Sequence, residues 1–472
     1  MSLTLGNSEN LSVYSSATQI AEAIKTGQTT SEAITLACLR RIGEVNEKIN
    51  AVFQLQTEAA LEQAKQADTD LARGIFYGPL HGLPMTTKDS FDTAGVVSTA
   101  GTLGRKNYIP SKDATIVERL KSAGAILLGK TNTPELTLAG HTDNLVYGWT
   151  SNPYALDRSP GASSGGAAAI VSAGGAAFDI GTDTGGSIRL PSHYCGLCGI
   201  KPTSGRVART GHIISYDSYD QFLTTIGPIA RYVEDLKTIL PIISGPDGID
   251  PYVYDIPIGF SEETKLEDLK FCFFTDNDFL TPCAEVVRTV KDVARELEKT
   301  GAVIEAFCPE VLQETLDMWL AVITADGGYT KKKILADSGT EQTSKHLKWL
   351  SELSMDEGIG KFPQKDFADM FERWAHYQSR VTSAFFNFDI IVCPVSAVPA
   401  PKADYESIFE VVSYVGAFNL TGWPAVTVPA GMTKEGLPIG VQIVGKPWEE
   451  AKILAVAEYI EKLFGGYKPP AI

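Results

Sequence analysis

Apolar positions recur three and four residues apart in two stretches near the start of the chain, Ser16–Lys25 and Ser31–Lys48. This spacing places them on one face of a helix. Ser31 is a suitable residue to cap the second helix at its N-terminus. The pattern therefore predicts a helical hairpin over residues 15–70, lying on a larger body.

A different pattern begins at Gly78 and continues to Ala230, where short apolar runs typical of strands alternate with helical periodicity. The strand-like runs are Leu83–Thr87, Ala125–Leu128 and Ala176–Ile180, and the helical ones are Ala114–Ala123 and Ala167–Ala173. The same alternation returns as strand Lys270–Thr275, helix Ala284–Thr300 and strand Ala302–Phe307. Alternation of this kind predicts an α/β sheet with helices on its faces.

The remaining stretches complete one domain. Residues 310–385 are helix-rich with aromatics, typical of a lid or a pocket-forming insert. Further strands are expected at Asp389–Pro394, Ala425–Pro429 and Ile439–Val444, with a closing helix at Glu449–Phe464. Since no linker or repeat interrupts the chain, we expect a single domain over residues 1–472. Its parts are the hairpin at 15–70, a core at 78–230, a variable pocket-forming region at 240–385 and C-terminal strands with the closing helix at 386–472.

Composition places this domain among ordinary soluble globular proteins. The chain has 472 residues, of which 44% are hydrophobic and 21% charged, so it can bury a core without metal or disulfide support. With 57 acidic and 41 basic residues the net charge is −16. A field of that sign repels phosphate backbones and anionic lipid, so we expect neither nucleic acid nor membrane as a partner.

Cysteine usage and hydropathy point to a cytoplasmic protein. The seven cysteines are sparse and odd in number, as expected for reduced thiols. The first residues lack the pattern of a secretory signal. No run approaches the ~18 apolar residues of a membrane span.

Two segments match known binding motifs in sequence but lack what those motifs need to bind a ligand. Residues 124–131 fit the P-loop pattern, but the residues between Gly124 and Gly129 are Ala-Ile-Leu-Leu, a buried strand where phosphate binding needs a loop. Cys195 and Cys198 form a CxxC pair with no second pair to complete a zinc site. We expect no metal and no cofactor.

Residues 161–165, Gly-Ala-Ser-Ser-Gly, fit the nucleophile elbow of serine hydrolases. The elbow needs a strand before the serine, whereas loop-forming residues precede it here. It also needs a later Asp and His, and no motif recommends one of the histidines. A Ser-His-Asp α/β-hydrolase with Ser163 as nucleophile stays an alternative.

A second turn lies downstream at Thr184-Gly185-Gly186-Ser187. Such a sequence can expose successive backbone N–H groups that hold an oxyanion, with the Ser187 hydroxyl beside them. On spacing alone, two tight turns at a sheet edge explain the pattern equally well.

These segments together resemble the amidase signature family. Its signature is a Gly/Ser-rich segment that runs into Gly-Thr-Asp-Thr-Gly-Gly-Ser-Ile-Arg, here residues 181–189, and then into residues 195–203. Residues 82–89 resemble the family's lysine motif, and residues 418–431 and 437–442 its C-terminal strands. The resemblance implies one large α/β domain with a mixed central β-sheet covered by helices on both faces, and no cofactor.

The resemblance also implies a Ser–cisSer–Lys triad. Ser187 would be the nucleophile, Ser163 the bridging serine held by a cis peptide bond, and Lys88 the base. Ala162 stands where family members often have glycine. The oxyanion hole would consist of the amides of Thr184, Gly185, Gly186 and Ser187. By the family's layout, Thr137 would contact substrate.

The chemistry of this triad follows from the residue types. A serine hydroxyl is a weak nucleophile that must lose its proton as it attacks. No histidine is placed to take it, so a desolvated, neutral Lys88 is the available base. A bridging hydroxyl can accept and donate, and so can pass the proton to the leaving amine. The alternative for Lys88 is a salt bridge, with Asp89 or another neighbour.

Other residues are expected to be structural. Asp183 and Arg189 should brace the turns by hydrogen bonds, and Lys130 and Lys201 should be structural or solvated. A set of aromatics in the variable region fits an apolar acyl pocket or plain core packing: Trp319, Tyr329, Trp349, Phe367, Phe371, Trp374 and Tyr377.

We therefore expect an amidohydrolase that cleaves linear carboxamides through an acyl-serine intermediate. Members of the family act on small aliphatic and aryl amides, fatty acid amides and cyclic amides. The alternative is the catalytic, glutaminase-type subunit of a tRNA-dependent amidotransferase. The expected partner is a small-molecule amide, and the assembly considered is a homodimer.

Overall fold

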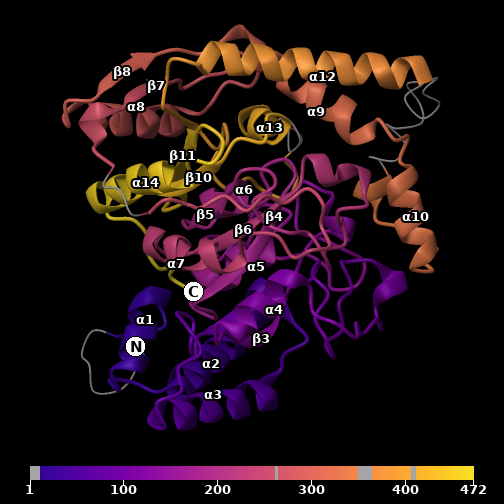
Figure 1. The fold of residues 1–472 in the computed structure, drawn as a ribbon, viewed down its shortest axis with the longest axis vertical. Coiled ribbons are helices and arrows are strands. Elements are labelled where there is room, and N and C mark those ends of the chain that lie inside the picture. Colours follow the sequence, from indigo (N-terminus) through magenta and orange to yellow (C-terminus); the bar gives the residue numbers. More distant parts are fainter. Residues whose placement is uncertain (1–10, 261–263, 349–363, 406–410) are drawn as a thin grey trace.

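The structure is a computed structural model that describes residues 11–260, 264–348, 364–405 and 411–472. Within these residues, eleven strands form one sheet in the order β1-β3-β2-β4-β6-β5-β10-β11-β9-β7-β8. The sheet runs from the N-terminal helices to the end where β7, β8 and the long helix α12 lie (Figure 1). Strands from both ends of the sequence thus belong to one sheet, as predicted.

The strands are β1 (Val52–Phe53), β2 (Pro84–Lys88), β3 (Ile126–Thr131), β4 (Phe178–Asp183), β5 (Cys198–Lys201), β6 (Thr225–Ala230), β7 (Lys270–Phe273), β8 (Val303–Ala306), β9 (Ile390–Pro394), β10 (Ala425–Met432) and β11 (Pro438–Gly445). The helices before residue 300 are α1 (Ala17–Lys25), α2 (Ser31–Ile49), α3 (Thr57–Ala72), α4 (Thr115–Ser122), α5 (Gly165–Ser172), α6 (Arg189–Tyr194), α7 (Val233–Ile243) and α8 (Ala284–Glu298). Those after it are α9 (Thr315–Thr324), α10 (Tyr329–Asp337), α12 (Gln364–Phe385), α13 (Val412–Leu420) and α14 (Glu450–Phe464).

The sheet is mixed. At one end β3, β2 and β4 are parallel, and at the other β8, β7 and β9 are parallel. Each end contains a strand–helix–strand unit, β2-α4-β3 and β7-α8-β8, the crossover that parallel pairing requires. The centre, from β4 through β6, β5, β10 and β11 to β9, is antiparallel. The parallel ends are the strands that the strand–helix alternation predicted.

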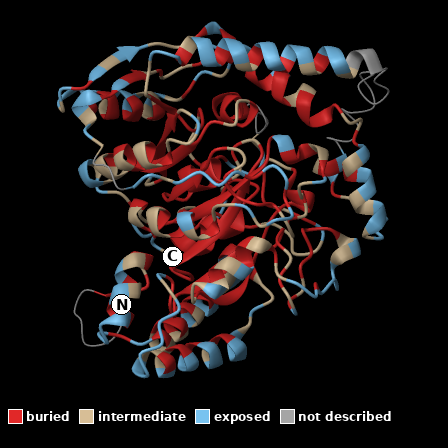
Figure 2. Cartoon of the chain, in the orientation of Figure 1, coloured by how far each residue is buried: buried red, intermediate tan, exposed pale blue. Residues whose placement is uncertain are grey.

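Helices cover both faces of the sheet, as expected. Successive side chains of a strand point to opposite faces. In β9, Ile390 and Val392 belong to the core shared with α7, α8 and α14, whereas Ile391 and Cys393 belong to the core shared with α9, α12 and α13. The inner strands are therefore buried on both sides, whereas the edge strand β8 is largely exposed. Most other exposed positions lie on the outer helices (Figure 2).

Helices α1 and α2 form where the periodicity predicted them, but residues 15–70 also contain β1 and most of α3, so they are not a simple hairpin. The capping prediction was also wrong. Thr30 is the N-cap of α2, and its side chain accepts a hydrogen bond from the Ala33 amide. Ser31 is the first residue of the helix, and its hydroxyl donates to the carbonyl of Gly82, 2.8 Å away. Ser31 thus ties α2 to the loop before β2, a contact that no local pattern reveals.

The sequence patterns also missed several short elements. β1, β5, β6, α6 and α13 are short or carry Gly and Pro, which weakens their periodicity. Within the described residues, no helix is long and apolar enough to cross a membrane.

Candidate active site

Lys88 is the last residue of β2, and its side chain is fully buried. Its Nζ donates to the Oγ of Ser163 at 2.6 Å and to the Oγ1 of Thr182 at 2.8 Å. Burial lowers the pKa of Lys88 well below its usual value, although the nearby carboxyls of Asp183 and Asp179 act in the opposite direction. A lysine in this state can be neutral and accept a proton.

The direction of the Lys88 side chain follows from its position in strand β2. Residues two apart in a strand face the same side, and the Thr86 hydroxyl, on the side of Lys88, donates to the Oδ2 of Asp179 at 2.6 Å. Thr131 of β3 donates to the same oxygen at 3.0 Å. Burial raises the pKa of Asp179 to about 7, against the opposing effect of these hydroxyls. Where Asp179 is ionised, its charge opposes the effect of burial on the pKa of Lys88.

Ser163 lies against the turn that carries Ser187. The Ala162–Ser163 peptide bond is cis, and Ser163 is buried next to the Nζ of Lys88. The following amide, of Ser164, donates to the Ser187 carbonyl at 3.3 Å. Lys88 and Ser163 are therefore in direct contact, whereas Ser187 is joined to this pair through the backbone contact of Ser164.

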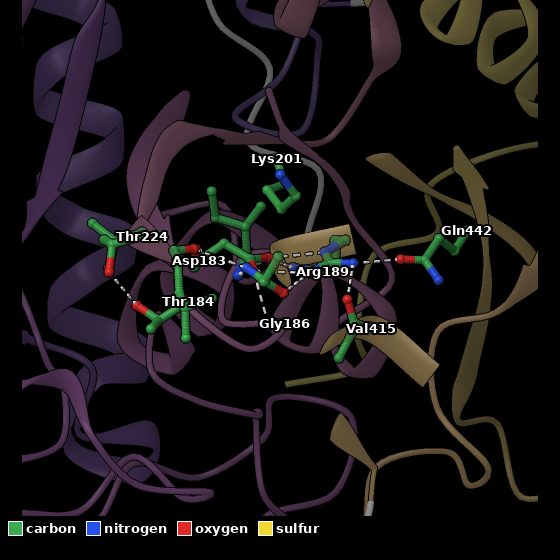
Figure 3. A network of polar contacts seen from close by, with 12 residues as sticks. Asp183, Thr184, Gly186, Arg189, Lys201, Thr224, Val415 and Gln442 are labelled. Atoms are coloured by element: carbon green, nitrogen blue, oxygen red, sulfur yellow. Dashed lines mark hydrogen bonds and ion pairs between the residues drawn. The ribbon is translucent and has the colours of Figure 1, made fainter. Parts of the chain in front are cut away.

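Asp183, the last residue of β4, organises the turn before Ser187 (Figure 3). Its carboxylate accepts the amides of Gly186 at 2.8 Å and of Ile188 at 3.1 Å. It also pairs with the guanidinium of Arg189 at 2.9 Å, with both side chains fully buried. Burial would raise the pKa of Asp183, but Arg189 and the amide of Asn419 hold it well below its usual range.

Arg189, the first residue of α6, also donates hydrogen bonds to residues in the C-terminal part of the chain. Its Nη1 donates to the Oε1 of Gln442 at 2.6 Å and to the carbonyl of Val415, and its Nη2 donates to the Oδ1 of Asn419 at 2.6 Å. Asp183 and Arg189 therefore brace the turns, as predicted. The charge of Asp183 is neutralised within the fold.

The structure corrects one member of the expected oxyanion hole. The Gly186 amide is bound to Asp183, so it braces the turn and is not directed at a substrate. Within the described residues, the amides of Thr184, Gly185 and Ser187 have no such acceptor. The physical reason is that a buried carboxylate needs several donors, and the Gly186 amide is one of those that the turn brings to Asp183.

Both glycines of the turn are required by their surroundings. A Cβ on Gly185 would lie 2.8 Å from the indole of Trp319. Gly186 has a φ of +97°, and a Cβ there would lie 2.6 Å from Val415. The Gly-Gly pair thus reflects close packing of the turn against α9 and α13.

Ser187 is half-buried and opens into a cavity, here termed the Ser187 cavity. The space between its walls, together with open solvent at the mouth, is about 570 Å³. Thr137, the residue expected to contact substrate, is part of its wall, together with Leu138, Ala139, Gly140, Ala162, Thr184, Gly185, Leu190, Tyr194, Trp319, Val411 and Val412. The Thr137 hydroxyl is buried and has no hydrogen-bond partner among the described residues.

The other lysines have structural partners. Residues 126–131 form β3, as predicted, and the Lys130 Nζ donates to the Phe91 carbonyl and the Thr93 hydroxyl. Lys201 is fully buried and donates to the carbonyl of Pro202 at 3.1 Å. Burial lowers the pKa of Lys130 to about 8 and that of Lys201 to about 7. Neither contacts Ser163 or Ser187.

In the described residues, the structure places no histidine where it could serve as the base for Ser163 in the nucleophile-elbow alternative. His141, His193 and His212 lie in other hydrogen bonds, and across the described residues no histidine bonds to Ser163. Cys195 and Cys198 are buried free thiols. The described residues contain no group of three His, Cys, Asp or Glu side chains that could hold a metal.

Sequence reasoning missed several residues that support the site. The Thr182 hydroxyl accepts a hydrogen bond from the Lys88 Nζ, and Asn419 and Gln442 accept hydrogen bonds from Arg189. The Trp319 indole donates to the Thr184 carbonyl at 2.9 Å. Asn419 and Gln442 lie in segments that resemble the family's C-terminal strands, a signal that could have marked them. Trp319 lies in the variable region and carries no such signal.

Most of the aromatics that fitted a pocket are core residues. Trp374 and Tyr377 of α12 are buried in the core that this helix shares with α9 and α13. Phe367 and Phe371 of the same helix pack against that core, and Tyr329 is exposed. Trp349 lies outside the described residues. Trp319 is the one residue of this set in the wall of the Ser187 cavity, among those described.

The chain is similar to several known proteins. A relative from Carboxydothermus hydrogenoformans, named as a subunit of glutamyl-tRNA(Gln) amidotransferase, is 33% identical over 95% of this chain and 97% of its own length. One of the same name from Geobacillus stearothermophilus is 34% identical over 90% of this chain and 92% of its own. Among solved structures, 6-aminohexanoate cyclic dimer hydrolase complexed with substrate superposes with a TM-score of 0.87 and 26% identity, over 98% of this chain and 99% of the other.

The relatives correct the expectation about partners. Their names include a tRNA and describe one chain of a complex, so the inference from net charge that this chain has no nucleic-acid partner is wrong. The physical reason is that the −16 charge describes one chain as an average. It says nothing about a complex in which another chain carries the contact surface.

The model of the amidase family matches residues 33–454, which include every segment described at this site. This match agrees with the mixed sheet and the two glycine-rich turns. The chain therefore belongs to the amidase family, hydrolases that act on C–N bonds.

Proposed function

We propose that this chain hydrolyses a carboxamide through an acyl-enzyme on Ser187, with Ser163 as proton relay and Lys88 as base. The observation that carries the proposal is the 2.6 Å contact between the Lys88 Nζ and the Ser163 Oγ in a buried site. A lysine whose pKa is lowered by burial and which is hydrogen-bonded to a serine hydroxyl is the kind of base that can activate a serine without histidine.

The first half of the reaction forms the acyl-enzyme. The substrate carbonyl enters the Ser187 cavity, and the Ser187 Oγ attacks its carbon. The proton of Ser187 passes to Ser163 as the Ser163 proton passes to Lys88. The negative charge on the carbonyl oxygen is held by the amides of Gly185 and Ser187, with Thr184 as a further donor.

The second half releases both products. The C–N bond breaks as the leaving nitrogen takes a proton from Ser163, which recovers one from Lys88, and ammonia or an amine departs. Water then attacks the acyl carbon, and its proton passes through Ser163 to Lys88. The acid leaves as the Ser187 Oγ takes a proton from Ser163, which recovers one from Lys88. Each step balances with these three side chains and water, and Thr137 would contact the substrate from the cavity wall.

A fluorophosphonate probe followed by mass spectrometry of the modified peptide tests the assignment. We expect the label on Ser187 and its loss in Lys88→Ala. Ser163→Ala should lower kcat at least ~100-fold, the size of a lost proton relay. A label on Ser163 would instead support the elbow alternative, and a wild-type rate in Ser163→Ala would mean direct transfer from Ser187 to Lys88.

A second candidate is the catalytic subunit of a tRNA-dependent amidotransferase. It is supported by the names of relatives that are 33–34% identical over at least nine-tenths of this chain. In that role the same acyl-enzyme would form from glutamine and release ammonia to a partner protein. Strict dependence of turnover on a co-purifying protein would support this candidate, and turnover of simple amides by the isolated chain would count against it.

A further inference from the structure

The wall of the Ser187 cavity offers no formal charge in the part of the chain that the structure describes. Its side chains are aliphatic, aromatic or hydroxyl-bearing, or are absent where glycine lines it. Among the described residues of this wall, Tyr194 is the one titratable residue apart from the serine itself. Its hydroxyl is hydrogen-bonded to Ser396 at 3.0 Å, and burial raises its pKa above the usual value, so it stays neutral.

The cations that lie behind this wall are already committed. Arg189 is fully buried, and its guanidinium is shared by Asp183, Asn419 and Gln442. Lys88 is fully buried against Ser163 and Thr182. A carboxylate on the acyl part of a substrate would therefore meet no free cation from these residues.

One side of the cavity is a fixed aromatic wall. The indole of Trp319 lies against Gly185, where a Cβ would be 2.8 Å away, and its N–H donates to the Thr184 carbonyl at 2.9 Å. This hydrogen bond satisfies the polar atom of the indole and leaves its apolar surface for the cavity. Leu138, Leu190, Val411 and Val412 add aliphatic surface.

We infer that the Ser187 cavity selects an uncharged, apolar acyl group and rejects the free amino acid glutamine. An apolar group gains from burial against Trp319 and its aliphatic neighbours. The ammonium and carboxylate of glutamine would lose hydration there without a counter-charge, which is strongly unfavourable. The inference rests on the proposed role of Ser187, and it counts against glutamine as the source of ammonia.

Matched amides test the selection on the full chain. Pentanamide has the five-carbon chain of glutamine without its two charges, and 5-amino-5-oxopentanoate carries the carboxylate alone. We expect kcat/KM for pentanamide to exceed that for glutamine at least ~100-fold, with the monoanion also poor. Equal or faster turnover of glutamine would overturn the inference.

Labelling separates failure of this inference from failure of the proposed function. If the fluorophosphonate labels Ser187 but pentanamide neither turns over nor protects Ser187 from the label, the inference fails and the nucleophile assignment stands. If Ser187 is not labelled, the proposed function itself fails.

A change of charge on the wall gives a second test. Val412→Arg should raise the ratio of kcat/KM for the monoanion to that for pentanamide at least ~10-fold, since the new cation would face the carboxylate. Val412→Met adds length without charge and should leave this ratio unchanged. Both substrates are measured on one sample, so the ratio does not depend on the folded fraction. An unchanged ratio in Val412→Arg would contradict the inference.

Discussion

Lys88, Asp179 and Lys201 are buried ionisable side chains, and the protonation of each follows from burial and its few partners. Lys88 has two hydroxyl partners and a strongly lowered pKa. Burial brings the pKa of both Asp179 and Lys201 to about 7. Because Lys88 contacts Ser163, turnover should respond to pH in the range where enzymes are assayed.

The pH dependence of turnover is the residue-scale prediction. Lys88 must be neutral to accept a proton, and its pKa is lowered. Below that pKa the ammonium form dominates, and kcat/KM should rise ~10-fold per pH unit until the pKa is passed and then level off. Measurement of kcat/KM from mildly acidic to alkaline pH checks this expectation.

Asp179→Asn provides the control for this profile. The Asp179 carboxylate raises the pKa of Lys88 where it is ionised, so its removal should shift the rise to lower pH without abolishing turnover. A flat profile in the wild-type chain would contradict the role of Lys88 as base.

At the scale of elements, the turn between β4 and α6 is held by one ion pair that reaches α13 and β11. Arg189 connects Asp183 at the end of β4 with Asn419 of α13 and Gln442 of β11. The position of Ser187 thus depends on three elements that are far apart in sequence. Stability and activity should therefore fall together when this connection is broken.

Arg189→Met tests that dependence. Removal of one partner leaves the Asp183 carboxylate buried without its counter-charge, which should lower the free energy of unfolding by about 3–5 kcal/mol and abolish turnover. Arg380→Met is the matched control, since Arg380 pairs with Glu314 at an exposed site where the two side chains are 50% and 48% accessible. It should cost less than ~1 kcal/mol. Urea unfolding of both variants measures the difference. Equal losses of unfolding free energy would contradict the role of Arg189 in holding this turn.

Gly186→Ala tests the close packing of the same turn. A left-handed φ costs an alanine about 1–2 kcal/mol, and the clash with Val415 should add about 1–3 kcal/mol. Gly245→Ala separates these effects, because Gly245 has a φ of +94° but nothing within 4 Å of a Cβ. Gly186→Ala should therefore lower the melting temperature more, with a larger loss of activity. The same shift in both variants would show that packing against α13 is unimportant.

At the scale of the whole molecule, the two parallel ends of the sheet are joined through its antiparallel centre. β5 and β10 pair from Ala425–Lys201 to Thr427–Gly199, and one core runs from Leu11 to Tyr467. No break in packing separates an N-terminal from a C-terminal unit in the described residues. The single domain over residues 1–472 remains a prediction, and unfolding can test it.

We expect one cooperative unfolding transition. Far-UV circular dichroism and tryptophan fluorescence should give coincident curves in urea, because Trp319 and Trp374 lie in the core beside α9 and α12 while the sheet extends through the whole chain. Two transitions at different urea concentrations would mean that the ends of the sheet unfold separately.

Prediction from sequence succeeded where a pattern is local. The amphipathic run over α8 and the apolar runs of β3 and β9 predicted their elements within a few residues. It failed for the cap of α2, because the Ser31 hydroxyl donates to the Gly82 carbonyl instead. It also failed for the Gly186 amide, which donates to the Asp183 carboxylate. In both cases a competing partner, created by folding, decided the outcome.

The sequence by itself determined the family, the strand–helix alternation and the identity of the chemical groups at the site. These depend on residue type and near spacing, which the chain carries in linear order. Only the tertiary structure decided that Lys88 meets Ser163, that Arg189 is held by Gln442, and that Trp319 closes the cavity beside Ser187. The physical reason is that these contacts join segments that are far apart in the sequence. Burial, which sets their energies and protonation, exists only once the sheet and its helices have packed.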